Sequence, residues 1–288
     1  MSSTALEKFP IIRAPLTGDK IRNIFASLKE KYLEKVGILE RSREERKVLQ
    51  VIDKVFQIVS STYLKKPLKK EREELKVFVV KTNRKFAEKS YEAYPSIVNE
   101  NGMTKDQAIE YLEKSPIKGE YDVEFKRLII NLQQIKEIHK DDKKAQEACL
   151  IVTTIHETLH HLGDFGENYN GYGLSWLNEG TAEFIALMIA QEIYSLEFRN
   201  FMCNEYRESM KALVDLALVV GEEVLTLAFF NKSFYPIEDK LKRTGFSEND
   251  IKELLRLGAE STKSEEANKL FRDYLIKIRR RKKEKETS

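Results

Sequence analysis

Two histidines four residues apart, His156 and His160, constrain this chain more than any other feature of its sequence. In an α-helix, residues at this spacing lie on one face about one turn apart, so both imidazoles can bind the same metal ion. Glu157 directly follows the first histidine and can reach a water on that ion without being a ligand, as a general base for hydrolysis requires. The stretch therefore predicts a helix that carries a catalytic metal site.

A third ligand is expected, because zinc in catalytic sites usually has three protein ligands and one open position. Glu179 is the candidate: 18 residues separate it from His160, and it lies in a segment with its own helical pattern. Three of the four histidines fall within residues 156–161, which favours a site over scattered polar residues on a helix surface. His161 is rotated by about 100° from its neighbour and is not an expected ligand. Glu183 is either a partner of a ligand histidine or an exposed carboxylate.

The segment at residues 176–183 reads Trp-Leu-Asn-Glu-Gly-Thr-Ala-Glu. Together with the His-Glu-x-x-His stretch and the 18-residue gap, it resembles the gluzincin metallopeptidases, and its first five residues are most similar to the aminopeptidase N group. The resemblance covers about a quarter of the chain. It implies that His156, His160 and Glu179 bind Zn²⁺, and that Glu157 is the general base and proton shuttle in hydrolysis of a peptide or protein substrate.

The chain departs from that pattern in two places. Thermolysin-like gluzincins stabilise the oxyanion with a downstream histidine, but no histidine follows His161. The aminopeptidase-like group uses a downstream tyrosine, for which Tyr235 is the best-spaced candidate, ahead of Tyr194 and Tyr206; a core position is the alternative for each. The Gly-x-Met-Glu-Asn segment that holds the substrate amine in aminopeptidases is absent, and residues 119–123 are the nearest glycine-led acidic segment. We therefore expect an endopeptidase or a narrow oligopeptidase, active or latent.

The resemblance also implies an α+β fold that is mostly α. This zincin-like metallopeptidase fold has a small mixed sheet, an active-site helix and a helical C-terminal lobe. Along the chain it predicts an N-terminal helical segment at residues 1–66 and an upper lobe with the sheet and active-site helix at 67–163. Residues 164–288 would form a helical lower lobe that contains the glutamate ligand helix and a basic C-terminal helix.

Hydrophobic spacing predicts the individual elements. A β-branched stretch at residues 75–82 predicts a strand, and residues 91–104 and the glycine-rich residues 163–175 are expected to be loops. Residues 121–135 are ambiguous, because their apolar spacing suits a helix while residues 128–132 suit a strand. The resemblance favours an edge strand above the cleft that pairs with extended substrate. Three- and four-residue periodicity predicts helices, the first two as a hairpin, at residues 19–35, 43–63, 105–114, 143–162, 176–194, 197–220, 221–232, 247–257 and 264–284.

Composition limits the partners and the compartment. The net charge is +3 although 34% of residues are charged, so the surface mixes both signs and carries no global nucleic-acid or membrane footprint. The chain begins without a signal-peptide pattern, and no apolar run reaches the length of about 18 residues that a membrane span needs. We therefore expect a cytoplasmic protein in which Cys149 and Cys203 are buried thiols rather than a disulfide. The oligomeric state is not indicated.

Two functions from other classes stay open as alternatives. One is a catalytically inactive protein that keeps the zincin fold as an interaction module. The other is a nucleic-acid-associated protein that uses the basic C-terminal helix, where three arginines and two lysines follow Ile278. A solvated helix end, favourably placed against the helix dipole, also explains this run.

Overall fold

The computed structural model describes residues 42–93, 103–166, 168–169, 171–195 and 207–286. The chain divides into two compact units, Met1–Arg46 and Lys47–Ser288. The predicted helix at residues 19–35 lies outside the described residues, so its hairpin with the helix at 43–63 stays a prediction, as does the three-part division of the chain. In the first unit, the described residues begin helix α2, where Ser42 and Glu45 cap one another's backbone N–H groups.

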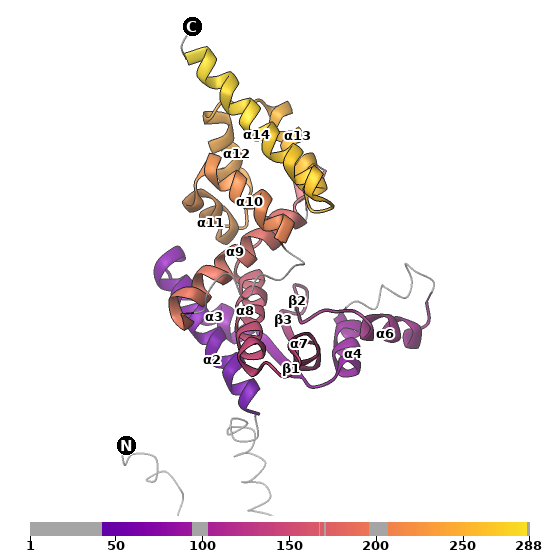
Figure 1. The fold of residues 1–288 in the computed structure, drawn as a ribbon. Helices are drawn as coiled ribbons and strands as arrows, with labels where there is room; N and C mark the ends of the chain where they lie inside the picture. The colour runs from indigo at the N-terminus through magenta and orange to yellow at the C-terminus, as the bar shows by residue number, and fades with distance from the viewer. Residues whose placement is uncertain (1–41, 94–102, 167, 170, 196–206, 287–288) are drawn as a thin grey trace, which may run out of the picture. The chain divides into compact units, whose positions relative to one another are not determined.

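A small mixed sheet of three strands forms the β part of the second unit. The strands are β1 (Lys76–Val80), β2 (Gly119–Asp122) and β3 (Arg127–Asn131), in the spatial order β1-β3-β2. β1 and β3 are parallel, and β2 and β3 are antiparallel. Helices make up most of the remaining described chain (Figure 1), so the predicted α+β, mostly α class is confirmed.

The strand expected at residues 128–132 exists, but its predicted place at the edge of the sheet is wrong. It is β3, the central strand, and all five of its residues are buried. A strand covered on both faces shows a continuous apolar run, and this explains the sequence Arg127-Leu-Ile-Ile-Asn131. The edge strand beside the predicted site is β2, with the sequence Gly-Glu-Tyr-Asp, whose polar residues carry no hydrophobic alternation.

Six helical elements surround or precede the sheet. The predicted helix at 43–63 is confirmed as α2, which runs on into a π-helical turn, and the predicted helix at 105–114 is confirmed as α6. The expected loop at 91–104 begins later than predicted because α4 reaches Ala93; residues 94–102 lie outside the described part. The bounds are α2 (Arg43–Ile58), η2 (Val59–Leu64), α3 (Lys69–Glu74), α4 (Asn83–Ala93), α6 (Lys105–Glu113) and α7 (Leu132–His139).

Two long helices, α8 (Lys143–Leu162) and α9 (Ser175–Tyr194), pack against each other through the centre of the core. Asp142 caps the start of α8 by accepting hydrogen bonds from two backbone N–H groups, and Gly163 follows its end. α9 is buried on nearly all sides, which is typical of a helix inside a core. Both predicted helices are confirmed, and the loop between them contains a short hairpin of β4 (Asn168–Tyr169) and β5 (Tyr172–Gly173).

The C-terminal part is helical, as predicted. Ser247 begins α13 with a capping box, and the short helix α12, which starts at Tyr235 with a proline at its second residue, was not predicted. Cys149 is a buried free thiol, whereas Cys203 lies outside the described residues. Among the described helices, none combines the length and apolar character that a membrane crossing requires. The bounds are α10 (Arg207–Val220), α11 (Glu222–Phe230), α12 (Tyr235–Arg243), α13 (Glu248–Ser261) and α14 (Glu265–Glu286).

Candidate metal centre

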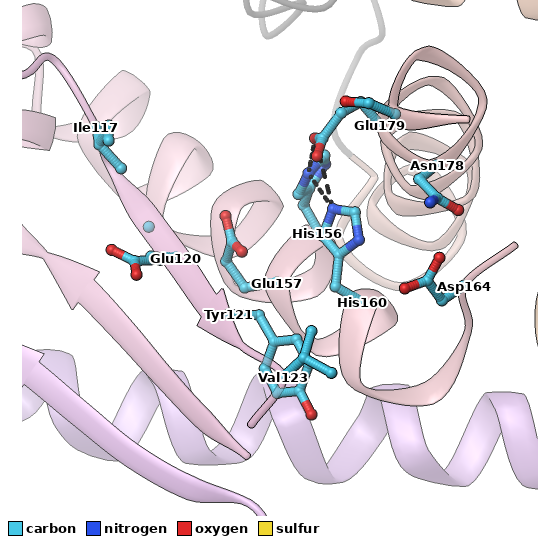
Figure 2. Close-up of a pocket in the computed structure, with 12 residues that line it drawn as sticks. Ile117, Glu120, Tyr121, Val123, His156, Glu157, His160, Asp164, Asn178 and Glu179 are labelled. Atoms are coloured by element: carbon cyan, nitrogen blue, oxygen red, sulfur yellow. Dashed lines mark hydrogen bonds and ion pairs between the residues drawn. The ribbon is translucent and has the colours of Figure 1, made fainter. Parts of the chain in front are cut away.

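The packing of α8 against α9 brings His156, His160 and Glu179 together. His156 Nε2 lies 3.0 Å from His160 Nε2 and 3.1 Å from Glu179 Oε2, and His160 Nε2 lies 3.5 Å from the same carboxylate oxygen. Figure 2 shows the three side chains pointing toward one another from the two helices. Among the described residues, these three form the group of side chains that could hold a metal ion.

The three donor atoms are spaced as zinc ligands would be. Zinc binds imidazole nitrogen and carboxylate oxygen at about 2.0–2.2 Å, so ligand atoms in tetrahedral geometry lie about 3.3 Å apart. The three separations in the structure fall on both sides of this value. Two imidazoles and one carboxylate supply three donors, so a four-coordinate ion bound here would have one position left for another group.

Glu183 determines which nitrogen of His156 faces the group. Glu183 Oε2 lies 3.0 Å from His156 Nδ1, and because an ionised carboxylate only accepts hydrogen bonds, Nδ1 carries the proton. When His156 is neutral, its Nε2 therefore points a lone pair at Glu179 and at His160, and lone pairs that face one another repel. A single proton on Nε2 can form a hydrogen bond with only one of these two partners, whereas a metal ion can bind all three donor atoms. A carboxylate behind a ligand histidine is the usual support of a metal site.

Electrostatics in this group favour a positive charge at its centre. Burial lowers the pKa of His156, but hydrogen bonds to Glu179 and Glu183 outweigh burial and hold that pKa well above its ordinary value. Burial raises the pKa of Glu179, yet hydrogen bonds from the two histidines bring it well below its ordinary value. Glu183 is 3% exposed, and its Oε1 has no hydrogen-bond partner among the described residues. A buried carboxylate with one donor requires a compensating charge nearby, which a metal on His156 would provide.

The group lines a cleft of about 420 Å³ between the two helices and β2. Glu157, 7% exposed, lies between β2 and the two histidines in Figure 2. Its burial raises the pKa of the carboxyl group, against the opposing charges of His156 and His160. Four lining side chains are carboxylates, and none of the described lining residues is a lysine or arginine. The lining residues are Ile117, Gly119, Glu120, Tyr121, Val123, His156, Glu157, His160, Asp164, Ser175, Asn178 and Glu179.

Asn178, next to the expected ligand Glu179, has a positioning role that sequence reasoning missed. Its Oδ1 accepts a hydrogen bond from the Phe165 backbone N–H at 2.7 Å, and its Nδ2 donates to the Gly166 carbonyl at 3.0 Å. Asn178 thereby ties the loop after α8 to the first turns of α9. Only its place beside Glu179 could have drawn attention to it.

The structure does not bring Tyr235 into the cleft. Tyr235 begins α12, is 69% exposed and packs its ring edge-on against Tyr169. Tyr194 lies at the end of α9 with two lysine side chains over its ring, and Tyr206 lies outside the described residues. The tyrosine that lines the cleft is Tyr121, a residue that sequence reasoning did not select.

No protein-family model, curated protein or solved structure matches this chain. The site is therefore described by its own geometry: two histidines and a glutamate that converge, a carboxylate behind one histidine, and a buried glutamate beside them at the side of a cleft.

Proposed function

We propose that this protein is a zinc-dependent peptidase of the gluzincin type with a zincin-like fold. The observation that carries the proposal is the convergence of His156 Nε2, His160 Nε2 and Glu179 Oε2 within 4.8 Å of one another, with Glu183 fixing the proton of His156 on the far side of the ring. Two imidazoles and a carboxylate suit zinc better than the harder ions magnesium and calcium, which prefer oxygen ligands.

The location of the site favours catalysis over a purely structural metal. Structural zinc sites are closed by four protein ligands, whereas catalytic sites have three and keep one position open. Here three donors line an open cleft, and the side chain of Glu179 is 32% exposed. A buried general-base candidate beside the donors is also unnecessary in a structural site. These features favour an enzyme over the interaction-module alternative.

Glu157 is assigned the proton-transfer role. A zinc ion in this site would supply a Lewis acid that polarises the substrate carbonyl and lowers the pKa of water. Glu157 accepts the proton of the attacking water and later delivers it to the leaving amine. Its burial suits this task, because a carboxylate with a raised pKa is a stronger base. Tyr235 has no part in the proposal, since it lies away from the cleft lining.

The position of β2 supports a peptide as the substrate. β2 is an edge strand of the sheet and lines the same cleft as Glu157. The edge strand of a sheet can accept an extended peptide as an added strand, with main-chain hydrogen bonds that are independent of sequence. The basic run after Ile278, which motivated the nucleic-acid alternative, falls mostly among side chains that the structure does not describe.

Metal content is the first test. Elemental analysis of tag-free wild-type protein should give one zinc ion per chain, and Glu179→Ala should retain little or none. A peptide library should then yield cleavage that disappears on chelation and returns with added zinc. If the wild-type protein binds no metal after zinc addition, the hydrolase proposal fails; if it binds zinc and cleaves no peptide, the interaction-module alternative gains support.

A further inference from the structure

The place of Glu179 at the cleft depends on the backbone of the first two turns of α9. The side chain of Glu179 is 32% exposed, and its carboxylate meets two histidines that both belong to α8. The distance from the carboxylate to those histidines is therefore set by where α9 lies relative to α8. The contacts that hold this part of α9 from behind bear directly on the geometry of the three donors.

Trp176, three residues before Glu179, packs against the C-terminal helices α13 and α14. It is 3% exposed, and its ring meets that of Phe271 in α14 edge-on, with centroids 5.5 Å apart. The indole Nε1 is buried and has no hydrogen-bond partner among the described residues, although a buried tryptophan N–H usually has one. The ring is thus held in place by the shape of its surroundings rather than by a hydrogen bond.

Gly258 in α13 allows the close packing of Trp176. A Cβ atom at residue 258 would lie 2.3 Å from Trp176 Cζ2, 2.4 Å from Cε2 and 2.9 Å from Cη2. The optimal separation of carbon atoms is about 3.5–4.0 Å, so any side chain here would displace either the indole or α13. Glycine inside a helix is less favourable than alanine, and the approach of the indole accounts for glycine at this position.

A second close approach follows Glu179 directly. A Cβ atom at Gly180 would lie 3.0 Å from the Ser209 carbonyl oxygen and 3.4 Å from Leu213 Cβ, and both of these residues belong to α10. The backbone of α10 therefore lies against α9 one residue after the expected ligand. Along the sequence, Glu179 stands between a contact with α13 at residue 176 and a contact with α10 at residue 180.

We propose that Trp176 and Gly258 are positioning residues of the metal centre. Their contact fixes the first turns of α9, and through them the carboxylate of Glu179, relative to the two histidines of α8. Gly180 contributes in the same way through α10. The C-terminal helices thereby take part in metal binding, although none of the described residues that line the cleft belongs to them. The inference rests on the zinc-binding part of the proposed function and does not depend on peptidase activity.

The zinc affinity of the full-length chain, measured by competition with a chromogenic chelator, tests this role. Gly258→Ala should weaken zinc binding by about tenfold or more, as is typical for groups that orient a ligand, although residue 258 is not one of the three donors. Gly173→Ala, where an added Cβ meets nothing within 4 Å, is the matched control. Urea unfolding of the metal-free proteins records any loss of stability separately. Wild-type zinc affinity in a folded Gly258→Ala variant overturns the proposal.

A rescue experiment distinguishes positioning from a general loss of packing. Trp176→Phe removes indole atoms that the methyl group of Gly258→Ala would meet. The double variant should bind zinc about two- to tenfold more tightly than Gly258→Ala alone, because residues in contact are energetically coupled. Where Gly258→Ala does not fold, Trp176→Phe alone decides, and we expect it to weaken zinc binding by about two- to tenfold because the smaller ring supports the turn less well. No rescue in the double variant, or wild-type affinity in Trp176→Phe, overturns the proposal.

Fluorescence reports on the contact itself, since Trp176 is the only tryptophan of the chain. In the metal-free protein, Gly258→Ala should change the emission wavelength or intensity, whereas Gly173→Ala should leave both as in the wild type. Unchanged emission in Gly258→Ala, together with weaker zinc binding, would overturn Trp176 as the link between α13 and Glu179.

Zinc binding also separates this inference from the proposed function. A wild-type chain that binds no zinc after zinc addition overturns the function and, with it, the positioning of a ligand. A chain that binds zinc equally well with glycine or alanine at residue 258 leaves the function intact and overturns the inference alone.

Discussion

The two sides of the cleft are built in different ways. The helical side, formed by α8 and α9, presents charged side chains that pair with one another across the two helices, as His156 does with Glu179 and Glu183. The strand side, formed by β2, brings Gly119 close to Glu157, joins the Tyr121 hydroxyl to His161, and adds the carboxylate of Glu120, which accepts a hydrogen bond from Ser90. Under the proposed function, metal binding would belong to the helices and substrate placement to the strand, so single substitutions should separate the two.

Replacing Glu179 by alanine tests the helical side most severely. Two imidazoles alone bind zinc weakly, so we expect zinc affinity to fall by more than about 100-fold, beyond the usual effect of residues that only orient a ligand, and peptidase activity to disappear. Competition with a chromogenic chelator measures the affinity. Glu192→Ala, on the exposed face of the same helix, is the control. Full zinc occupancy in Glu179→Ala would show that Glu179 is not a ligand and that the helical side does not bind metal as proposed.

Glu157→Gln should separate chemistry from metal binding within the helical side. The amide has nearly the shape of the carboxylate but cannot accept the proton of water, so kcat should fall by about 10²- to 10⁴-fold. Zinc content should stay that of the wild type, because Glu157 is not one of the three donors. Elemental analysis and a fluorogenic peptide assay on the same preparation check both results. A variant that keeps its kcat would remove Glu157 from the mechanism.

Glu183→Gln should weaken the site without removing a ligand. The substitution removes the buried charge that holds His156 Nδ1–H, and changes of this kind typically cost 10- to 100-fold in metal affinity. Activity at saturating zinc should recover in part, which distinguishes this variant from Glu179→Ala. Chelator competition at several zinc concentrations gives the affinity. A zinc affinity equal to that of the wild type would show that the hydrogen bond between Glu183 and His156 does not contribute to metal binding.

Asn178→Ala should have the smallest effect, and it should act on stability. The substitution leaves the buried Phe165 N–H without its acceptor, and an unsatisfied buried donor costs about 1–3 kcal/mol. Urea unfolding monitored by circular dichroism, with zinc removed, measures the difference. The exposed Asn249 provides the control through Asn249→Ala. If Asn178→Ala unfolds at the wild-type urea concentration, the link between the loop and α9 carries no stability.

The helical side could be predicted from the sequence because its geometry is local. Spacing within one helix fixes the relation of His156 to His160, and apolar periodicity together with Gly163 gave the bounds of α8 that the structure has. Glu179 required a second helix, whose packing partner periodicity does not identify. The resemblance to gluzincins supplied this link, and the distances in the structure agree with it.

The strand side could not be predicted in the same way. β2 has four residues and no hydrophobic alternation, whereas the apolar β3 beside it resembled the strand that the site was expected to need. The contribution of Gly119 is an absent side chain, which has no signal in a single sequence. Tyr235 was chosen by spacing after Glu179, but the start of α12 directs it toward Tyr169 and solvent.

The hydrogen bonds of Asn178 have a consequence for how the protein would acquire its metal. They join the loop after α8 to α9 without using any of the three donors, and the two helices share a buried apolar core. Small zinc domains that lack such a core are unfolded until metal binds. Here the apoprotein would already be folded, and zinc at 100 times its dissociation constant would add about 2.7 kcal/mol of stability. The supply of metal, rather than folding, would then set the fraction of active molecules.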